Sequence, residues 1–164
     1  MKTTRWTTLL LAMALGAGVS SIAQAAGNTA KAALQQATEA AKEWKPDAVL
    51  TIISSSAVGE DGKAPTWFYG FYSRRSDSYL NVTAKGRTVE TLEVGTGRTE
   101  ALPAEFIDSD HAMATAIKLG IKGTGPTMGL TRAAWIVNGG TVKGDTGVWI
   151  NPRTGQLIKR QTME

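Results

Sequence analysis

The sequence predicts an α+β fold in which a helix followed by a three- to four-stranded antiparallel sheet occurs twice in tandem. Three observations support this fold class. Small apolar residues recur at helical spacing over residues 30–44, and strand-like runs separated by turn residues follow them. The same order of elements then returns after a connector that begins at Gly95 and ends near Pro103.

The first predicted helix has an apolar stripe made largely of alanine. Asn28 or Thr29 is expected to cap its start, and Pro46 ends it because proline cannot continue the helical hydrogen bonds. Alanine side chains are short, so we expect this helix to lie close against the face of a sheet. The stripe consists of Ala30, Ala33, Leu34, Ala37, Ala40, Ala41 and Trp44.

Strands are predicted after this helix at residues 48–54, 67–73, 79–83 and 88–94. The first is dense in β-branched residues, the second is aromatic on both faces, and the last two alternate between apolar and polar residues. Short runs rich in glycine and charged residues separate them. The first half is therefore expected to be a helix followed by an antiparallel meander.

The second half repeats this pattern. Asp108 is expected to cap a second helix that Gly120 ends, and strands are predicted at residues 127–131, 133–138, 147–151 and 156–160. Asn138-Gly139-Gly140 is a hairpin signal, and Asn151-Pro152-Arg153-Thr154-Gly155 is a turn that ends on a glycine.

The two halves can be overlaid, which predicts an internal duplication. Trp67 then matches Trp135 and Gly86 matches Gly155, with separations of 19 and 20 residues within each half. The alternative is that any α+β meander would show a similar order. We predict two halves at residues 26–97 and 98–164 that form one globular unit, because a chain with no cysteine depends on its hydrophobic core alone.

The first 25 residues have the pattern of a secretory signal. Lys2 and Arg5 precede an uncharged stretch from Thr7 to Ile22, and Ala23-Gln24-Ala25 has the small-x-small form of a cleavage site. The alternative is an uncleaved anchor, but the uncharged run is shorter than the roughly 20 residues that span a bilayer. We expect cleavage near Ala25, a periplasmic or secreted product, and no stable membrane anchor.

Loss of this segment would lower the net charge from +4 to +2, because Lys2 and Arg5 leave with it. The remaining basic residues form no cluster larger than Arg74-Arg75 and Lys159-Arg160. Nucleic acid is therefore not expected as a partner.

Residues of the second half resemble a PepSY-type domain. The resemblance rests on residues 107–112 with Ala116, on Trp135-Ile136-Val137, and on residues 148–158, where a turn ending in Thr154-Gly155 joins the last two strands. It covers about residues 103–161, and the first half would be a more divergent copy. The tandem arrangement is similar to the architecture of β-lactamase-inhibitor proteins. This chain departs from the family pattern at His111, in the acidic first turn, and at Pro152, where the family is variable.

The resemblance implies an extracytoplasmic module without catalytic activity. PepSY-type domains occur in propeptides of thermolysin-like metalloproteases and in free-standing periplasmic proteins, where peptidase inhibition or ligand binding is suspected. The family has no catalytic residue to transfer to this chain, so the Thr-Gly turn and the alanine helix are transferred only as determinants of the fold.

His111 is the sole histidine and raises the question of catalysis or metal binding. It follows Asp110 in the first turn of the second predicted helix, where carboxylates are favoured by the helix dipole. No second histidine and no cysteine completes a zinc site, and no Gly-x-Ser-x-Gly elbow is present. We expect a surface residue, no cofactor, no metal and no enzymatic activity; an enzyme that uses His111 is the alternative.

The aromatic residues are the remaining candidates for function. Six of them fall between Trp67 and Tyr79, and two tryptophans lie in strands of the second half. In a strand, Trp67, Tyr69 and Phe71 point to one face, while Phe68 and Tyr72 point to the other. The residues predicted to bind a partner are Trp67, Tyr69, Phe71, Tyr79, Trp135 and Trp149.

The predicted function is that of an exported binding module. Its partner would be a protein, with a peptidase as one candidate, bound through an aromatic sheet face and the loops at 57–66, 74–77 and 138–147. The alternative is a carrier of a small apolar ligand in a pocket between helix and sheet. A third interpretation is that one set of aromatic rings is core and that the other is covered by the second half or by a dimer partner. The oligomeric state stays open.

Overall fold

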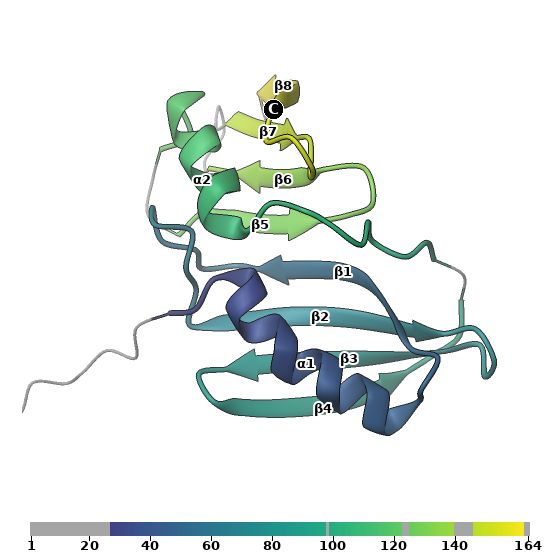
Figure 1. Cartoon of the computed structure of the whole chain (residues 1–164). Coiled ribbons are helices and arrows are strands. Elements are labelled where there is room, and N and C mark those ends of the chain that lie inside the picture. Colours follow the sequence, from purple (N-terminus) through teal and green to yellow (C-terminus); the bar gives the residue numbers. More distant parts are fainter. Residues whose placement is uncertain (1–26, 98, 123–124, 140–145, 163–164) are drawn as a thin grey trace, which may run out of the picture.

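The computed structural model describes residues 27–97, 99–122, 125–139 and 146–162. The predicted signal at residues 1–25 and most of the loop at 138–147 lie outside these residues. The described chain is α+β, as predicted, with two helices and eight strands (Figure 1). The elements are α1 (Ala30–Trp44), β1 (Val49–Ser55), β2 (Thr66–Ser73), β3 (Ser78–Lys85), β4 (Thr88–Val94), α2 (Ser109–Lys118), β5 (Thr127–Leu130), β6 (Trp135–Asn138), β7 (Thr146–Ile150) and β8 (Leu157–Thr162).

All eight strands form a single antiparallel sheet in the order β4-β3-β2-β1-β5-β6-β7-β8. The central pairing joins β1 to β5, with Ile53 opposite Leu130. Both helices lie on the same side of the sheet, where α1 packs on β2, β3 and β4 and α2 packs on β6 and β7 (Figure 1). The other side, which neither α1 nor α2 covers, is called the open face below.

The sixth strand starts two residues later than predicted. Thr131 and Ala134 close a tight turn, in which the Thr131 N–H donates to the Ala134 carbonyl over 2.9 Å and the Thr131 hydroxyl donates to the same oxygen. Residue 133 is therefore part of the turn, and β6 begins at Trp135.

The starts of the two helices meet above the central pair of strands. The Ser109 hydroxyl, at the start of α2, accepts the N–H of Ala30 over 2.9 Å and donates to the carbonyl of Gly62 over 2.7 Å. The carboxylate of Asp108 accepts the N–H of Lys31 over 2.9 Å. A Cβ at Gly62 would overlap the backbone of Asp110, so glycine permits this close approach.

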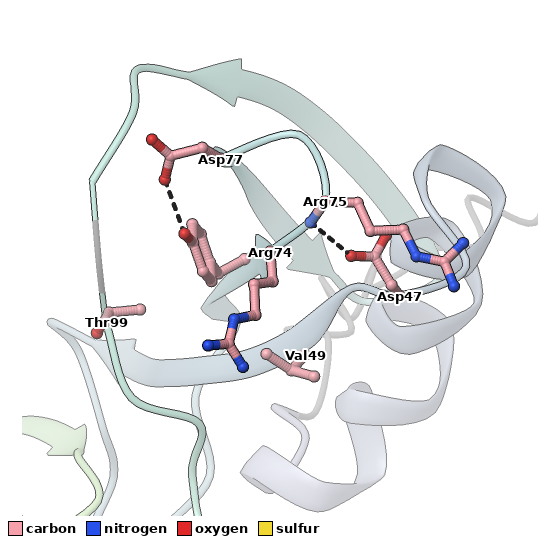
Figure 2. A pocket seen from close by; sticks show the side chains of 7 residues that line it. Asp47, Val49, Arg74, Arg75, Asp77 and Thr99 are labelled. Atoms are coloured by element: carbon pink, nitrogen blue, oxygen red, sulfur yellow. Dashed lines mark hydrogen bonds between the residues drawn. The ribbon is translucent and has the colours of Figure 1, made fainter.

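The turn between β2 and β3 is held against the end of α1 by Asp47 (Figure 2). Its carboxylate accepts the Ser73 hydroxyl over 2.9 Å and the N–H of Arg75 over 3.0 Å. The Arg75 N–H bond, followed by the Ser73 bond and the charge of Arg75, holds the pKa of Asp47 below its ordinary value against an opposing effect of desolvation. Asp77 completes the turn at φ 48°, a conformation that aspartate tolerates better than most residues.

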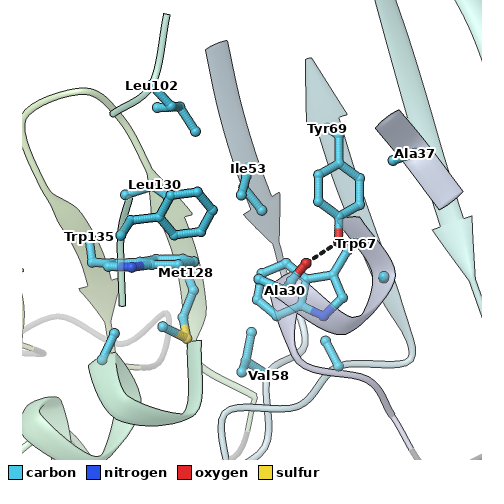
Figure 3. Close-up of a cluster of buried hydrophobic side chains, with 14 of the residues drawn as sticks. Ala30, Ala37, Ile53, Val58, Trp67, Tyr69, Leu102, Met128, Leu130 and Trp135 are labelled. Carbon is cyan, nitrogen blue, oxygen red and sulfur yellow. Dashed lines mark hydrogen bonds between the residues drawn. The ribbon is translucent and has the colours of Figure 1, made fainter. Parts of the chain in front are cut away.

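Two tryptophans form the centre of the core beneath the helices (Figure 3). The rings of Trp67 and Trp135 meet edge to face, with centroids 6.5 Å apart and planes at 74°. Each indole N–H donates to the residue before a helix cap: Trp67 to the Asn28 carbonyl over 2.7 Å, and Trp135 to the Ile107 carbonyl over 2.9 Å. Buried residues from both halves of the chain belong to this one cluster.

Tyr69 links β2 to the first turn of α1. Its hydroxyl donates to the carbonyl of Ala30 over 2.7 Å (Figure 3). Burial raises the pKa of Tyr69 far above its ordinary value, and the negative charge of Asp108 adds to that rise. The phenol is therefore a neutral hydrogen-bond donor within the core.

We expect Ser109→Ala to lower the free energy of unfolding by about 2 to 4 kcal/mol, because a buried N–H and a buried carbonyl both lose their partner. Chemical denaturation monitored by tryptophan fluorescence measures this loss. Ser56→Ala, at an exposed serine, is the control and should change the value by less than about 0.5 kcal/mol. Equal stability of the two variants would contradict the structural role of Ser109.

Candidate functional site

A single row of side chains crosses the open face from one edge of the sheet to the other. Residues that are directly opposite in an antiparallel pair point to the same face, so the strand register defines the row. Its central side chains are small, those on either side of the centre include apolar residues, and the side chains at its two ends are charged. In order from β4 to β8 it consists of Glu90, Thr83, Phe68, Ser54, Gly129, Ile136, Trp149 and Lys159.

The small residues at the centre of this row produce a groove. Ser54 and Gly129 lie on the central strands β1 and β5, and the larger Phe68 and Ile136 stand on the strands to either side. The resulting groove has a volume of about 490 Å³ and is called the seam groove. It is lined by Ile52, Ser54, Ser55, Ser56, Phe68, Thr127, Met128, Gly129, Thr131, Ile136 and Asn138, and none of these described residues carries an ionisable side chain.

A bulge in β1 adds a second apolar side chain to the same face. The register shifts between Leu50 and Ile52, so that Val49 and Ile52 both face outward and are 41% and 45% exposed. The Thr51 hydroxyl at the bulge donates to the carbonyl of Gly70 over 3.0 Å. A Cβ at Gly70 would lie 2.6 Å from Cγ2 of Ile52, so this glycine makes room for the isoleucine.

A second groove continues the first toward the connector between the halves. It has a volume of about 540 Å³ and is lined by Ile52, Gly70, Tyr79 and Asn81 on the sheet. Arg132 lies at its border and pairs with Glu100 over 2.9 Å, with both side chains largely exposed. The charged residues are thus at the margin of the open face, and its centre is neutral.

Four of the six residues predicted to bind a partner are core residues, which corrects that prediction. Trp67, Tyr69, Phe71 and Trp135 are at most 2% exposed, because they point toward the helices. Their rings fill the space between helices and sheet and present no surface to a partner.

The other two predicted residues, Tyr79 and Trp149, lie on the open face and are half-buried. The ring of Tyr79 packs against that of Tyr72 with centroids 4.9 Å apart. The ammonium group of Lys159 lies 4.8 Å from the centre of the Trp149 ring, which orients both side chains.

Sequence reasoning missed the residues that shape the seam groove. Phe68 points opposite to Trp67, as strand alternation predicts, and is 45% exposed, but it is not among the six residues predicted to bind. Ile136 alternates with the buried Trp135 and Val137, which is a signal that was present in the sequence. The pairing of Ser54 with Gly129 depends on contact between β1 and β5, which no local pattern indicates.

His111 lies on the surface at the start of α2. Its Nδ1 is 2.8 Å from the carboxylate of Asp110, and its side chain is 76% exposed. Asp108 is turned away from it toward α1. Across the residues described, no three His, Cys, Asp or Glu side chains are grouped so that they could hold a metal ion.

Comparisons with known proteins show a fold likeness. No protein-family model matches this chain, and no curated protein matches it. The fold is similar to that of a crystal structure described as a putative lipoprotein from Clostridium difficile 630, with a TM-score of 0.55 and 12% sequence identity. The likeness covers 78% of this chain and 91% of that one. Within the described ranges, no helix is long and apolar enough to cross a membrane.

We expect Gly129→Val to leave the melting temperature unchanged or to raise it. A Cβ at Gly129 would make only an ordinary contact, 3.8 Å from the Ile53 carbonyl, and valine favours the strand conformation. The matched variant Gly70→Val should lower the melting temperature, because its Cβ overlaps Ile52. Thermal denaturation followed by circular dichroism measures both, and the reverse order would show that the two glycines have been assigned wrongly.

We expect zinc to leave the melting temperature unchanged, because His111 has only Asp110 beside it and lacks further ligands among the residues described. Scanning calorimetry with and without Zn²⁺, on the wild type and on His111→Ala, provides the measurement. A rise that the substitution removes would establish His111 as a ligand.

Proposed function

We propose that this protein is an exported, non-enzymatic binding module whose seam groove receives an apolar side chain of a protein partner. The observation that supports this proposal is the neutral groove between Phe68 and Ile136, at the centre of a sheet face that neither of the two described helices covers. Half-exposed apolar residues on both sides of a groove are typical of surfaces that bind proteins.

The shape of the open face favours a protein over a small enclosed ligand. A small apolar ligand is usually surrounded on most sides, whereas the seam groove lies along an extended face with polar residues around it. The space between helices and sheet, where a carrier would hold its ligand, is filled by Trp67, Trp135 and their neighbours. A partner would bury Phe68 and Ile52 and gain most of its binding energy there.

We further propose that the chain arose by duplication of a PepSY-like unit. Three matched features support this. The strand order runs outward from β1 and β5 in the same sequence on both sides, and each half has a tryptophan that bonds to the residue before its helix cap. Gly86 and Gly155, both at positive φ, precede the last strand of each half. A peptidase is the partner class that this relationship favours.

Export is part of the proposal. It is supported by the charge and apolar pattern of residues 1–25, and by the description of the structural neighbour as a putative lipoprotein. The exported product would be periplasmic or secreted after cleavage near Ala25. Catalysis by His111 has less support, because its ring is exposed and has one carboxylate as its partner.

The test compares how strongly the wild type and three variants bind protein partners. Phe68→Ala removes one wall of the seam groove, and Gly129→Leu fills the groove from strand β5. We expect each substitution to weaken partner binding at least tenfold. Ile117→Ala is the matched control, because Ile117 is 40% exposed on α2 and on the other side of the sheet. Immobilised wild type and variants are exposed to a periplasmic extract, and the bound proteins are compared.

Thermolysin serves as a defined probe in the same design. Inhibition of its activity by the wild type and by Ile117→Ala, but not by Gly129→Leu, would support a peptidase as partner. Binding of a partner that is equally strong in all variants would show that the seam groove is not the site, and failure of the wild type to retain any protein would contradict the proposal.

A further inference from the structure

A separate pocket lies at the end of the sheet, on the side of the β2–β3 turn (Figure 2). It has a volume of about 890 Å³, which is within the usual range for sites that bind small molecules. The turn contributes Arg74, Arg75 and Asp77, β1 contributes Val49, and the connector contributes Thr99. This sheet-end pocket shares no lining residue with the seam groove.

Two carboxylates, Asp47 and Asp77, and two arginines, Arg74 and Arg75, surround the sheet-end pocket. Asp47 accepts the Ser73 hydroxyl, which lies 2.9 and 3.0 Å from its two carboxylate oxygens, and the N–H of Arg75, and the charge of Arg75 acts on it. Asp77 accepts the Tyr72 hydroxyl over 2.7 Å. Among the described residues, neither arginine forms an ion pair, but the charge of Arg75 acts on Asp47, whereas no carboxylate is paired with Arg74. It extends its guanidinium group past Val49, as Figure 2 shows.

An apolar wall stands beside this guanidinium group. Val49 is 41% exposed because of the β1 bulge, and it lies opposite Tyr72 in the strand register. The ring of Tyr72, which lines the pocket and is 8% exposed, packs on the ring of Tyr79 with centroids 4.9 Å apart and planes at 38°. A positive charge next to an apolar and aromatic wall is suited to a ligand with a flat apolar body and one anionic group.

The turn that carries Arg74 is held in place before any ligand arrives. The Ser76 hydroxyl donates to that of Ser73 over 3.0 Å and lies 2.8 Å from that of Ser78, and Lys45 bonds to Ser78 from the end of α1. Together with Asp47, these bonds restrain the backbone on both sides of Arg74. A restrained turn lowers the conformational entropy that binding costs.

We propose that the sheet-end pocket binds a small organic carboxylate with a flat apolar body. The carboxylate pairs with the guanidinium group of Arg74, and the body packs against Val49 and Tyr72. The nearby carboxylate of Asp77 disfavours ligands with a second negative charge, so a monoanion fits best.

Isothermal titration calorimetry with 2-naphthoate and with the neutral 2-naphthamide tests this proposal on the purified protein. We expect 2-naphthoate to bind and 2-naphthamide to bind at least tenfold more weakly. Arg74→Gln should weaken 2-naphthoate about tenfold or more and leave 2-naphthamide unchanged, because it removes the positive charge and retains a shorter, uncharged polar side chain. Added salt should weaken the wild type toward the level of Arg74→Gln.

Two controls separate the pocket from the rest of the surface. Arg87→Gln removes an exposed arginine from the turn at the other end of β3 and should leave 2-naphthoate affinity unchanged. Phe68→Ala alters the seam groove and should also leave it unchanged, so this proposal and the proposed function can fail independently. Equal affinity for acid and amide, equal loss in both arginine variants, loss in Phe68→Ala alone, or no binding by the wild type would overturn the proposal.

Discussion

The junction between the two helix starts is the interaction on which the rest of the structure depends. The first N–H groups of a helix have no partner within it, and the positive ends of two helix dipoles repel one another when they meet. Asp108 and Ser109 resolve both problems, because one carboxylate and one hydroxyl accept N–H groups of α1 while they stand at the start of α2. The halves therefore share one core, and the first two N–H groups of α1 depend on residues of the other half.

This junction also explains why the open face has its groove at the centre. With the helices joined on one side, the strands beneath them must fill the core with large residues, and Ile53 and Leu130 do so where β1 meets β5. The neighbouring positions, Ser54 and Gly129, point to the open face, where no core has to be filled, and their side chains are small. The depth of the seam groove thus results from a difference between the two faces of the same pair of strands.

Local chemistry was enough to predict the elements, and it was not enough to predict the site. Thr29 and Asp108 accept backbone N–H groups at the starts of helices, and Gly120 takes the left-handed conformation after α2, so the helices could be located from residue type. In β2, however, aromatic residues occupy both faces, and alternation alone does not show which set meets the helices. The face was decided by long-range packing, which placed Trp67 inside and Phe68 outside.

The bulge in β1 couples the two surfaces for which binding is proposed. A strand exchanges its faces at every residue, so without the bulge Val49 and Ile52 would point to opposite sides of the sheet. Because the register shifts between Leu50 and Ile52, the same strand gives Val49 to the sheet-end pocket and Ile52 to the seam groove. The Thr51 bond to Gly70 and the space that Gly70 leaves for Ile52 hold this shift in place. One irregular position in the central strand therefore supplies an apolar side chain to each of the two surfaces.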